Sequence, residues 1–525
     1  MLATIRSAGV AGVEAYDIAV EVDVAPGLPH FTVVGLAAGA VKESRERVAS
    51  AIVNSGFLLP PRRTTVNLAP ADTRKEGTAL DLPIALGLLV ATGQLDAGRV
   101  RDVAAVGELA LDGTLRPVRG ALPVARHVGA TPGTTLLLPS GNVAEARLVS
   151  GTRLSAPSSL REAVDALRRG ALPEPPPPPP ATSPSGPDPA PDLRDVVGQG
   201  AAKRALEIAA AGDHGLLLVG PPGSGKTMLA RCLAALLPRL SEAEALEVIA
   251  VHSVAGLVAP DRAPSFFRPF RAPHHTISSA GLVGGGSVPR PGEASLAHLG
   301  VLFLDEMLEF PRHTLDALRQ PLEDGHVVLA RAAGSVRFPA RFTLVGAMNP
   351  CPCGRAGDPA GRCVCAAADV QRYRARLSGP LADRVDLHVS VNAVPVRDLA
   401  ARADAERSCA VRERVERARA VQVTRYASLG VGCNGRVAGR WLERHTPVDR
   451  EARERLAVAA ERLGLSARAY YRVLRVARTI ADLDGDEAVT VASVAEALRY
   501  RPAVSDRADD GRASAGRAAH ATFEA

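Results

Sequence analysis

Residues Gly220–Thr227, GPPGSGKT, match the complete pattern of a phosphate-binding loop. A short apolar run, Leu216–Val219, precedes the loop, and the helix-forming run MLARCLAALL follows it. The glycines allow backbone N–H groups to turn towards phosphates, and the start of a helix adds partial positive charge. We expect Lys226 to reach the β and γ phosphates of a nucleotide and Thr227 to hold Mg²⁺. A chance glycine-rich turn is the alternative, but a lysine is kept here in a chain with four lysines among 63 basic residues.

A second apolar run, Val301–Leu304, ends in two carboxylates, Asp305 and Glu306. Hydrolysis of a nucleotide triphosphate needs one acid to bind Mg²⁺ and another to polarise the attacking water. We assign the first role to Asp305 and the second to Glu306. A strand with a solvated acidic end is the alternative, and it is disfavoured because the pair follows a phosphate loop in the same chain.

Apolar periodicity predicts the elements that must position these side chains. Strand-like runs at Leu216–Val219, Val301–Leu304 and Phe342–Ala347 alternate with helical stretches, which indicates a parallel α/β sheet. Beyond about Val396 the strand pattern fades and helices are predicted. These helices are expected at Arg412–Val423, Asp449–Leu463, Ala467–Ala481 and Thr490–Tyr500.

The N-terminal part shows a different order of elements. Alternating runs at Tyr16–Val24 and Phe31–Val34 predict strands, and Ala40–Ser55 and Leu80–Thr92 predict helices. This is typical of an α+β domain. A proline-rich run, PEPPPPPPATSPSGPDPAP, follows it and predicts an extended spacer, because proline cannot donate a backbone hydrogen bond.

Together these patterns predict a multidomain α/β and α+β protein. We place an N-terminal α+β domain at 1–170, a linker at 171–192, an α/β core at 193–394, a C-terminal helical lid at 395–502 and a disordered tail at 503–525.

Composition narrows the class of protein without naming a partner. Hydrophobic residues at 46% and charged residues at 23% are ordinary for a globular chain. A net charge of +7 over 525 residues permits a polyanionic partner but does not identify one. The chain has no apolar run of about 20 residues, and its opening does not look like an export signal. A cytoplasmic location and no membrane association are therefore expected.

Four of the seven cysteines, Cys351, Cys353, Cys363 and Cys365, lie within fifteen residues. An odd total argues against a disulfide framework. The two C-x-C pairs could supply four thiolates to one tetrahedral Zn²⁺, although C-x-C is a less frequent zinc spacing than C-x-x-C. Free thiols are the alternative.

Further motifs resemble the YifB/ComM family of magnesium-chelatase-like AAA+ ATPases over nearly the whole chain. The segments are DVVGQ at Asp195–Gln199, AMNPCPCG at Ala347–Gly354, LSGPLADRVDLHV at Leu377–Val389 and LSARAYYRVLRVARTIADL at Leu465–Leu483. The resemblance implies a phosphate-loop AAA+ core, ATP and Mg²⁺ as ligands, and a homo-oligomeric ring, a hexamer in this family.

The resemblance also implies residue roles. Asn349 would orient the attacking water, and Arg384 would enter the ATP site of a neighbouring subunit. Arg468 would touch the γ phosphate, with Arg475 as its alternative. The expected nucleotide contacts are Val196, Val197, Gln199, Gly220, Pro221, Pro222, Gly223, Ser224, Gly225, Lys226, Thr227 and Met228, with Thr227 and Asp305 holding magnesium.

The N-terminal domain resembles the ribosomal S5 domain 2-like fold of the Lon protease domain. The likeness lies in Thr73–Leu89 and Val106–Arg126, but the positions matched to the proteolytic serine and lysine are Ala79 and Val124. Without a nucleophile and its base, peptide hydrolysis has no mechanism. Lys42 and Lys75 have no assigned role, and we expect contact with nucleic acid, a neighbouring subunit or solvent.

Two insertions suggest what a motor of this kind would act on. Phe267–Gly300 is rich in Arg, His and Gly, and His326–Phe342 predicts a β-hairpin turning at Ala333–Ser335. Both resemble insertions that line the channel of helicase-like motors, where basic side chains can follow a phosphate backbone. The candidate DNA contacts are Arg271, His274, His275, Arg290, Arg331 and Arg337. Structural histidines and arginines paired with acids across subunits are the alternative.

The family resemblance implies an ATP-driven DNA helicase or branch-migration factor that acts on single-stranded or branched DNA in recombination of incoming DNA. A chelatase-type ATPase that remodels a protein partner is the second reading. ATP-dependent proteolysis is disfavoured by Ala79 and Val124, and a scaffold without enzymatic activity is disfavoured by the complete hydrolytic set.

Overall fold

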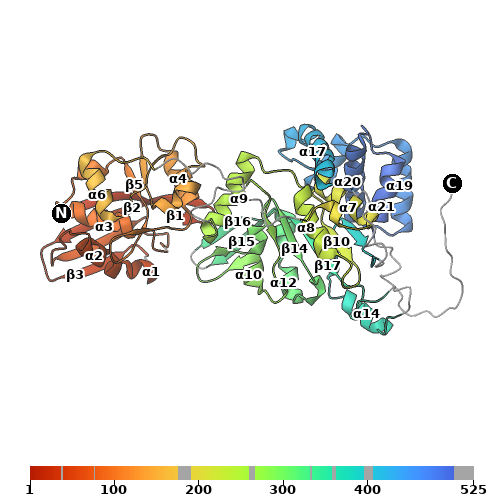
Figure 1. Cartoon of the computed structure of the whole chain (residues 1–525), viewed down its shortest axis with the longest axis horizontal. Helices are drawn as coiled ribbons and strands as arrows, with labels where there is room; N and C mark the ends of the chain where they lie inside the picture. The colour runs from red at the N-terminus through yellow and green to blue at the C-terminus, as the bar shows by residue number, and fades with distance from the viewer. Residues whose placement is uncertain are drawn as a thin grey trace. The chain divides into compact units, whose positions relative to one another are not determined.

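The computed structural model describes residues 1–36, 39–75, 77–175, 191–258, 266–331, 334–356, 362–394 and 406–501 (Figure 1). Two compact units result: Met1–Ala190 with Pro238–Thr343, and Pro191–Leu237 with Leu344–Ala525. Most of the expected linker and the whole expected tail lie outside the described residues. The domain boundaries drawn from the sequence remain a prediction.

The first unit contains a seven-stranded sheet in the order β3-β4-β2-β1-β5-β8-β9. Its longest strands, β1 (Leu2–Ala11) and β2 (Glu14–Ala25), pair antiparallel over their full length. Alternate residues such as Ile5, Val20 and Val22 are buried, as a half-covered strand requires. The remaining strands are β3 (His30–Val34), β4 (Arg63–Ala69), β5 (Val103–Ala105), β8 (Thr135–Leu137) and β9 (Arg153–Ser155).

Helices complete this part of the first unit. Helix α3 (Asp81–Ala91) packs on β1 and β2, and every residue of it is buried. The helix expected at Ala40–Ser55 is present but divided into two helices at Glu43. At the division, Ser44 Oγ donates to the Val41 carbonyl at 2.6 Å. The helices are α1 (Gly39–Lys42), α2 (Ser44–Asn54), α4 (Ala121–Gly129), α5 (Val143–Ala146) and α6 (Leu160–Arg169).

The rest of the first unit carries the acidic strand and the two insertions. Strand β14 (Val301–Leu304) is buried along its length and pairs parallel with β11 (Phe270–Arg271). The expected hairpin is confirmed as β15 (His326–Arg331) and β16 (Gly334–Pro339). The turn expected at Ala333–Ser335 is wrong in part, because Gly334 and Ser335 belong to β16 and pair with Arg331 and Ala330. The other elements are α9 (Glu242–Ala255), α10 (Ser279–Val283), β12 (Gly284–Gly285), β13 (Arg290–Pro291), α11 (Glu293–Leu296), α12 (Arg312–Asp316) and α13 (Arg319–Asp324).

Helix α9 joins the two sequence segments of this unit. Leu122 of α4 is buried in one cluster with Val248 and Ile249 of α9. The Gly120 N–H donates to the Ser253 carbonyl at 3.1 Å, which satisfies an otherwise open backbone donor at the start of α4.

The second unit is built on three parallel strands, with β10 (Leu216–Val219) between β17 (Thr343–Met348) and β18 (Leu387–Ser390). The strands expected at Leu216–Val219 and Phe342–Ala347 are confirmed within one residue. All four helices expected in the C-terminal part are also confirmed, and a further helix, at Gly439–His445, was not predicted. The helices of this unit are α7 (Gly200–Gly212), α8 (Lys226–Leu236), α14 (Ala367–Arg374), α15 (Gly379–Ala382), α17 (Ser408–Arg425), α18 (Gly439–His445), α19 (Arg450–Arg462), α20 (Ala467–Asp484) and α21 (Val491–Arg499).

A buried polar bridge connects helix α20 to these strands. His214, which is fully buried, places Nδ1 3.0 Å from Asp386 Oδ2 and Nε2 2.8 Å from Thr479 Oγ1. Arg472 of α20 donates to Asp386 Oδ1 at 3.4 Å. Burial alone would raise the pKa of Asp386, but the hydrogen bond and charge of His214, together with the charges of Arg472 and Arg501, lower it to about 2.

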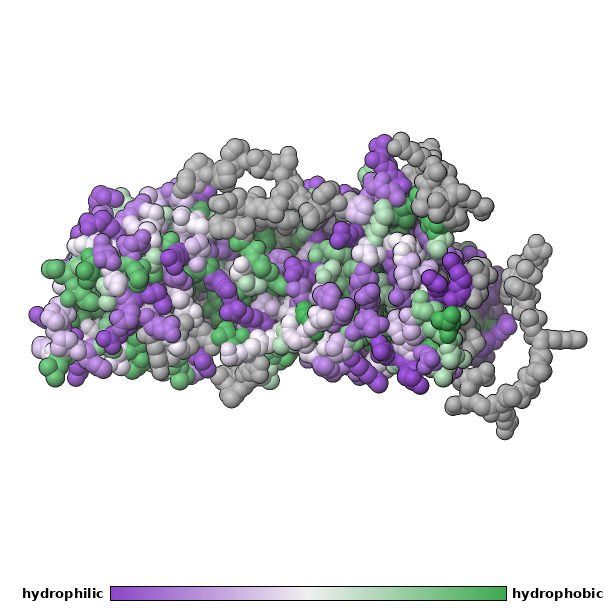
Figure 2. Space-filling view, turned by 60° about the horizontal axis from the view of Figure 1, so that its bottom comes forward, coloured by the Kyte–Doolittle hydropathy of each residue, from purple (hydrophilic) through white to green (hydrophobic). Residues whose placement is uncertain are grey.

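None of the described helices combines the length and apolarity that crossing a bilayer would require. On the face drawn in Figure 2, hydrophilic and hydrophobic side chains are interspersed.

The Asp386 bridge predicts an acid-sensitive contribution to stability. Because the pKa of Asp386 is about 2 in the folded chain against an ordinary 3.8, its contribution is complete above that ordinary value and is lost as pH falls towards 2. Asp386→Asn should therefore lower the free energy of unfolding by on the order of 2 kcal/mol near neutral pH, and the difference from wild type should shrink with acidification. Urea unfolding followed by circular dichroism measures this.

Asp369→Asn is the matched control, since Asp369 is half exposed and forms a surface pair with Arg372. It should change the free energy of unfolding by less than about 0.5 kcal/mol at every pH. A gap between wild type and Asp386→Asn that stays constant down to acid pH would contradict the assignment.

Candidate functional site

The phosphate loop lies in the second unit, between β10 and α8. Gly225 precedes α8 with φ +88°, a left-handed conformation that side chains rarely adopt. Gly220 is needed for a different reason, because a Cβ there would lie 2.1 Å from the Val391 carbonyl oxygen. The backbone can therefore turn tightly over the start of the helix, as phosphate binding requires.

Lys226 is the best-defined residue of the loop. Its side chain is nearly buried, and Nζ donates to the Gly220 carbonyl at 2.7 Å and to the Pro221 carbonyl at 2.8 Å. Nζ also lies 3.2 Å from Asn349 Oδ1. Lys226 and Asn349, the residue expected to orient the attacking water, therefore meet. They can do so because β10 and β17 pair in parallel, Lys226 lies beyond the end of β10 and Asn349 lies beyond the end of β17.

The loop fits a phosphate ligand on two further observations. A Cβ built at Gly223 or Gly225 meets no atom within 4 Å, so open space lies beside both glycines. Ser224 is buried, and its Oγ has no hydrogen-bond partner among the described residues. An unsatisfied buried hydroxyl next to open space is suited to a polar ligand. Thr227 and Met228, in the first turn of α8, are exposed and half-buried respectively.

The segment Asp195–Gln199, which contains three of the expected nucleotide contacts, belongs to the same unit. Gln199 Nε2 donates to the Asn392 carbonyl at 2.6 Å, just beyond the end of β18. Val196 is buried and Val197 is half-buried. This segment therefore lies at the same strand ends as the phosphate loop.

The three candidate arginines occupy different surroundings. Arg384 is half-buried between α15 and β18, and its Nη1 donates to the Pro380 carbonyl at 2.6 Å. Arg468 lies in the first turn of α20 and is exposed. Arg475, the alternative to Arg468, is half-buried, and burial lowers its pKa.

The acidic pair lies in the first unit. Glu306 follows β14 with φ +48°, and its N–H donates to Asp305 Oδ1 at 3.0 Å. The Glu306 carboxylate lies 3.6 Å from His275 Nδ1. His275 in turn contacts His274 with ring centroids 4.1 Å apart and Phe310 with an edge-on geometry. A residue of the first insertion therefore touches the expected catalytic glutamate.

The other basic candidates differ in how far their charge is already balanced. Arg271 forms a two-pronged ion pair with Glu293, with N–O distances of 2.6 and 2.8 Å. Arg290 is exposed, and exposed Arg337 approaches His326 Nδ1 at 3.0 Å. The side chain of Arg331 lies outside the described residues.

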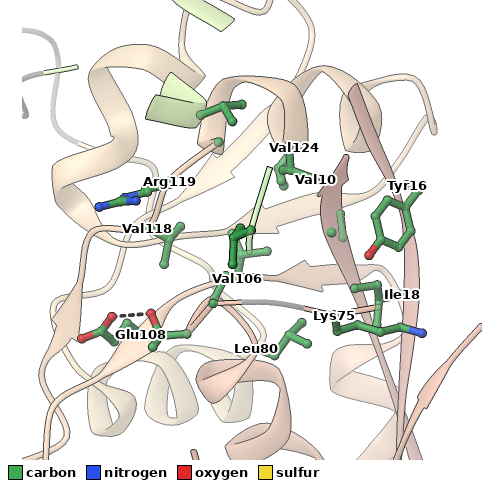
Figure 3. A pocket seen from close by; sticks show the side chains of 18 of the residues that line it. Val10, Tyr16, Ile18, Lys75, Leu80, Val106, Glu108, Val118, Arg119 and Val124 are labelled. Carbon is green, nitrogen blue, oxygen red and sulfur yellow. Dashed lines mark hydrogen bonds between the residues drawn. The ribbon is translucent and has the colours of Figure 1, made fainter. Parts of the chain in front are cut away.

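A cavity of about 490 Å³ opens in the first unit, and Ala79 and Val124 both line it. Figure 3 shows the cavity with Val124 among its labelled residues. Its polar lining includes Thr78, which donates a short hydrogen bond to Glu108. Lys75 is buried, donates to the Pro70 carbonyl, and has its pKa lowered by burial. The expectation that Lys75 is open to nucleic acid, a partner or solvent is therefore wrong; the side chain of Lys42 lies outside the described residues.

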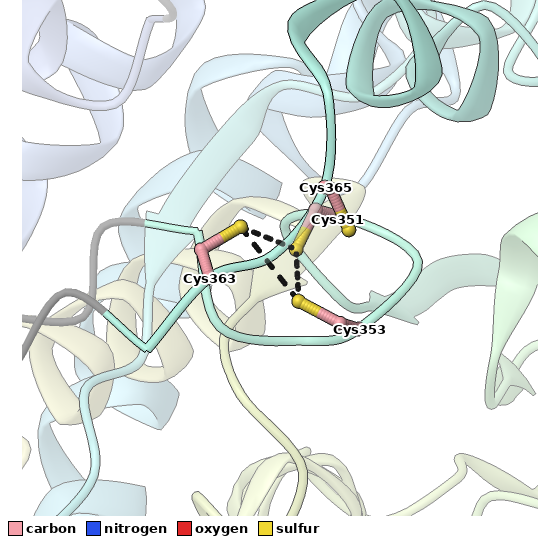
Figure 4. A group of neighbouring side chains, drawn as sticks. All are labelled: Cys351, Cys353, Cys363 and Cys365. Carbon is pink, nitrogen blue, oxygen red and sulfur yellow. Dashed lines mark hydrogen bonds between the residues drawn. The ribbon is translucent and has the colours of Figure 1, made fainter.

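The structure brings the four clustered cysteines together (Figure 4). Their sulfur atoms all lie within 4.8 Å of one another. Buried Cys232 and Cys433 and exposed Cys409 stand apart from this group.

Two pairings at the site were not foreseen from the sequence: His275 with Glu306 and Arg271 with Glu293. Each pair is separated by more than twenty residues, so no local pattern indicates it. Acidic residues near a basic insertion were the available hint, and spacing could not select the partners.

Family models for magnesium chelatase match three parts of the chain. "Subunit ChlI of Mg-chelatase" matches residues 20–142, "Magnesium chelatase, subunit ChlI" matches 192–399, and "Magnesium chelatase, subunit ChlI C-terminal" matches 405–501.

Individual relatives agree with these matches. The chain is 44% identical over 511 residues to the competence protein ComM of Haemophilus influenzae, covering 96% of this chain and 98% of that protein. It is 43% identical over 504 residues to the uncharacterized protein YifB of Salmonella typhimurium, covering 95% and 97%. A magnesium-chelatase 38 kDa subunit of Cereibacter sphaeroides is 30% identical over 171 residues, covering 30% of this chain and 51% of that subunit. The chain therefore belongs to the YifB/ComM family of magnesium-chelatase-like AAA+ ATPases.

Proposed function

We propose that this ATPase is a motor that uses ATP and Mg²⁺ to drive branch migration or unwinding of DNA in recombination of incoming DNA. One observation supports ATP binding: the position of Lys226 at the start of α8. The Lys226 ammonium lies 3.2 Å from Asn349 Oδ1. Carbonyls of the loop hold this ammonium. A nucleotide phosphate offers a charged acceptor in place of these neutral ones.

In this proposal the hydrolytic roles follow the charge that develops on the phosphates. Thr227 and Asp305 hold Mg²⁺, which neutralises phosphate charge. Glu306 polarises the attacking water and Asn349 orients it. Arg384 of a neighbouring subunit and Arg468 stabilise the γ phosphate. Phosphoryl transfer needs this positive charge more than it needs covalent help from the protein.

A closed ring is part of the proposal. If every ATP site receives Arg384 from its neighbour, each subunit must have one neighbour on either side, and a ring satisfies this. Family resemblance favours a hexamer. We also place the protein in the cytoplasm, where ATP and incoming DNA are both available.

Two observations support DNA as the substrate: the name of a relative and the exposed basic side chains of the two insertions. The relative of Haemophilus influenzae is named a competence protein. The insertions of this chain expose His274, Arg290 and Arg337, which can contact phosphates without reading sequence. Arg271 is left out of this set because Glu293 already balances its charge.

Contact between His275 and Glu306 supports a route from DNA to hydrolysis. His275 belongs to the insertion that we expect to meet DNA, and Glu306 is the residue that would polarise water. His275 Nδ1 lies 3.6 Å from the Glu306 carboxylate, so a movement of the histidine side chain changes the electrostatic environment of the carboxylate directly. DNA-stimulated hydrolysis is the expected consequence.

The likeness to the magnesium-chelatase subunit favours a second candidate, an ATPase that remodels a protein partner. The two candidates differ in what stimulates turnover, since one needs DNA and the other needs a protein.

We expect a four-way DNA junction to raise the ATPase rate at low salt, and the stimulation to fall steeply with added salt because phosphate contacts release counterions.

Lys226→Ala should lower turnover at least about a hundredfold by removing the charge that faces the phosphates. Glu306→Gln should lower turnover similarly and still bind a fluorescent ATP analogue. A Lys226-dependent ATPase that ignores DNA under all salt conditions would favour the protein-remodelling candidate instead.

Arg290→Ala and Arg337→Ala should each weaken DNA binding, and each should reduce the slope of log affinity against log salt by about one. Fluorescence anisotropy of a labelled junction measures both quantities. Arg450→Ala is the control, because Arg450 is highly exposed on α19 and pairs with Glu454 one turn further along the same helix. Equal slopes in all four proteins would remove both arginines from the proposed DNA contacts.

We also propose that the N-terminal domain has no peptidase activity, because Ala79 and Val124 line the cavity where the Lon-like fold would hold its serine and lysine. Purified protein with ATP and Mg²⁺ should leave casein intact on gels, and degradation that persists through further purification would contradict this.

A further inference from the structure

Four thiols converge on one point in the segment that follows β17 and Asn349. Cys351 Sγ lies 3.4 Å from Cys353 Sγ and 3.8 Å from Cys363 Sγ, and the last two are 3.7 Å apart. Cys365 completes a set whose sulfurs all lie within 4.8 Å (Figure 4). Four sulfurs bound to one tetrahedral Zn²⁺ at about 2.3 Å lie about 3.8 Å from one another. The observed spacing has this size.

Other uses of four close thiols fit less well. A disulfide joins sulfurs at about 2.05 Å and pairs each with one partner, whereas Cys351 here approaches two. A cluster of several iron atoms would hold its thiolates further apart than a single ion does. One small ion that prefers sulfur and tetrahedral geometry therefore matches the group best.

The backbone around the cysteines is suited to thiolates. The Ala356 N–H donates to Cys351 Sγ at 3.2 Å, and backbone groups of Val364 and Arg355 hydrogen-bond to Cys353. Four thiolates and one divalent cation carry a net charge of −2, which such N–H groups disperse. Binding is balanced without redox chemistry, because each bound thiol releases its proton to solvent.

We propose that Cys351, Cys353, Cys363 and Cys365 bind one structural Zn²⁺, and that this ion holds the loop against the phosphate loop.

The position of the cysteine-containing segment supports the claim that the ion holds it against the phosphate loop. Cys351 follows Asn349 by two residues, and Gly354 packs so closely on the phosphate loop that a Cβ there would lie 2.5 Å from Pro222 Cδ. Arg374 of α14 donates to the Pro350 carbonyl at 3.3 Å. Among the described residues, 350–356 and 362–366 form no helix or strand, so few backbone hydrogen bonds hold this segment. A metal would supply the missing constraint.

The metal content of the purified protein tests whether the four cysteines bind one Zn²⁺. Full-length protein purified without chelator should contain about one zinc per chain by mass spectrometry of the elements. Cys363→Ser should reduce this at least about tenfold, while Cys409→Ser, which alters an exposed cysteine outside the group, should keep it. Less than about a tenth of an equivalent in wild type, or stoichiometric iron in place of zinc, would overturn the proposal.

A second measurement covers the case in which Cys363→Ser does not fold. Wild-type protein depleted of metal and loaded with Co²⁺ should show the intense thiolate charge-transfer and tetrahedral bands of a four-sulfur site. A spectrum without those bands means an adventitious ion only and overturns the assignment.

Nucleotide affinity tests the second part, which rests on the proposed nucleotide site. Zinc-depleted wild type should bind a fluorescent ATP analogue at least about tenfold more weakly than reloaded protein. Lys226→Ala should keep its zinc and lose the analogue, so failure of the nucleotide site and failure of the metal site give different results. Unchanged affinity after complete zinc loss would overturn the link to the phosphate loop.

Discussion

The second unit depends on one buried polar bridge, in which His214 contacts both Asp386 and Thr479. His214 lies two residues before β10, Asp386 immediately precedes β18, and Thr479 belongs to α20. The bridge therefore joins the strand that carries the phosphate loop to the helix that carries Arg468. Buried polar groups of this kind stabilise only when all of them are satisfied, so the bridge specifies one arrangement of helix and strands.

From this anchor the nucleotide site follows by short steps. Parallel pairing of β10 with β17 places Asn349 next to the phosphate loop, and the glycine conformations leave open space beside the start of α8. Lys226 Nζ donates to two loop carbonyls and to Asn349. A charge that is already held beside the loop is prepared for a phosphate, since less reorganisation is needed when the ligand arrives.

The first unit combines an acidic strand, a basic insertion and a cavity whose lining includes the polar side chains of Thr78 and Lys75. Glu306 and His275 lie in contact, so the insertion and the expected catalytic carboxylate share one electrostatic environment. Ala79 and Val124 both line the cavity.

The sequence by itself determined the phosphate loop, the acidic pair, the main strands and helices and the membership of the cysteine group, because these depend on residues close together in the chain. It also indicated the family through motifs of this local kind. The tertiary structure decided which charged side chains meet and which are buried. Arg271 forms an ion pair with Glu293, His275 contacts Glu306, and Lys75 is buried. Those outcomes depend on contacts between distant segments, and the energy of a charge is set by its burial and partners rather than by its neighbours in sequence.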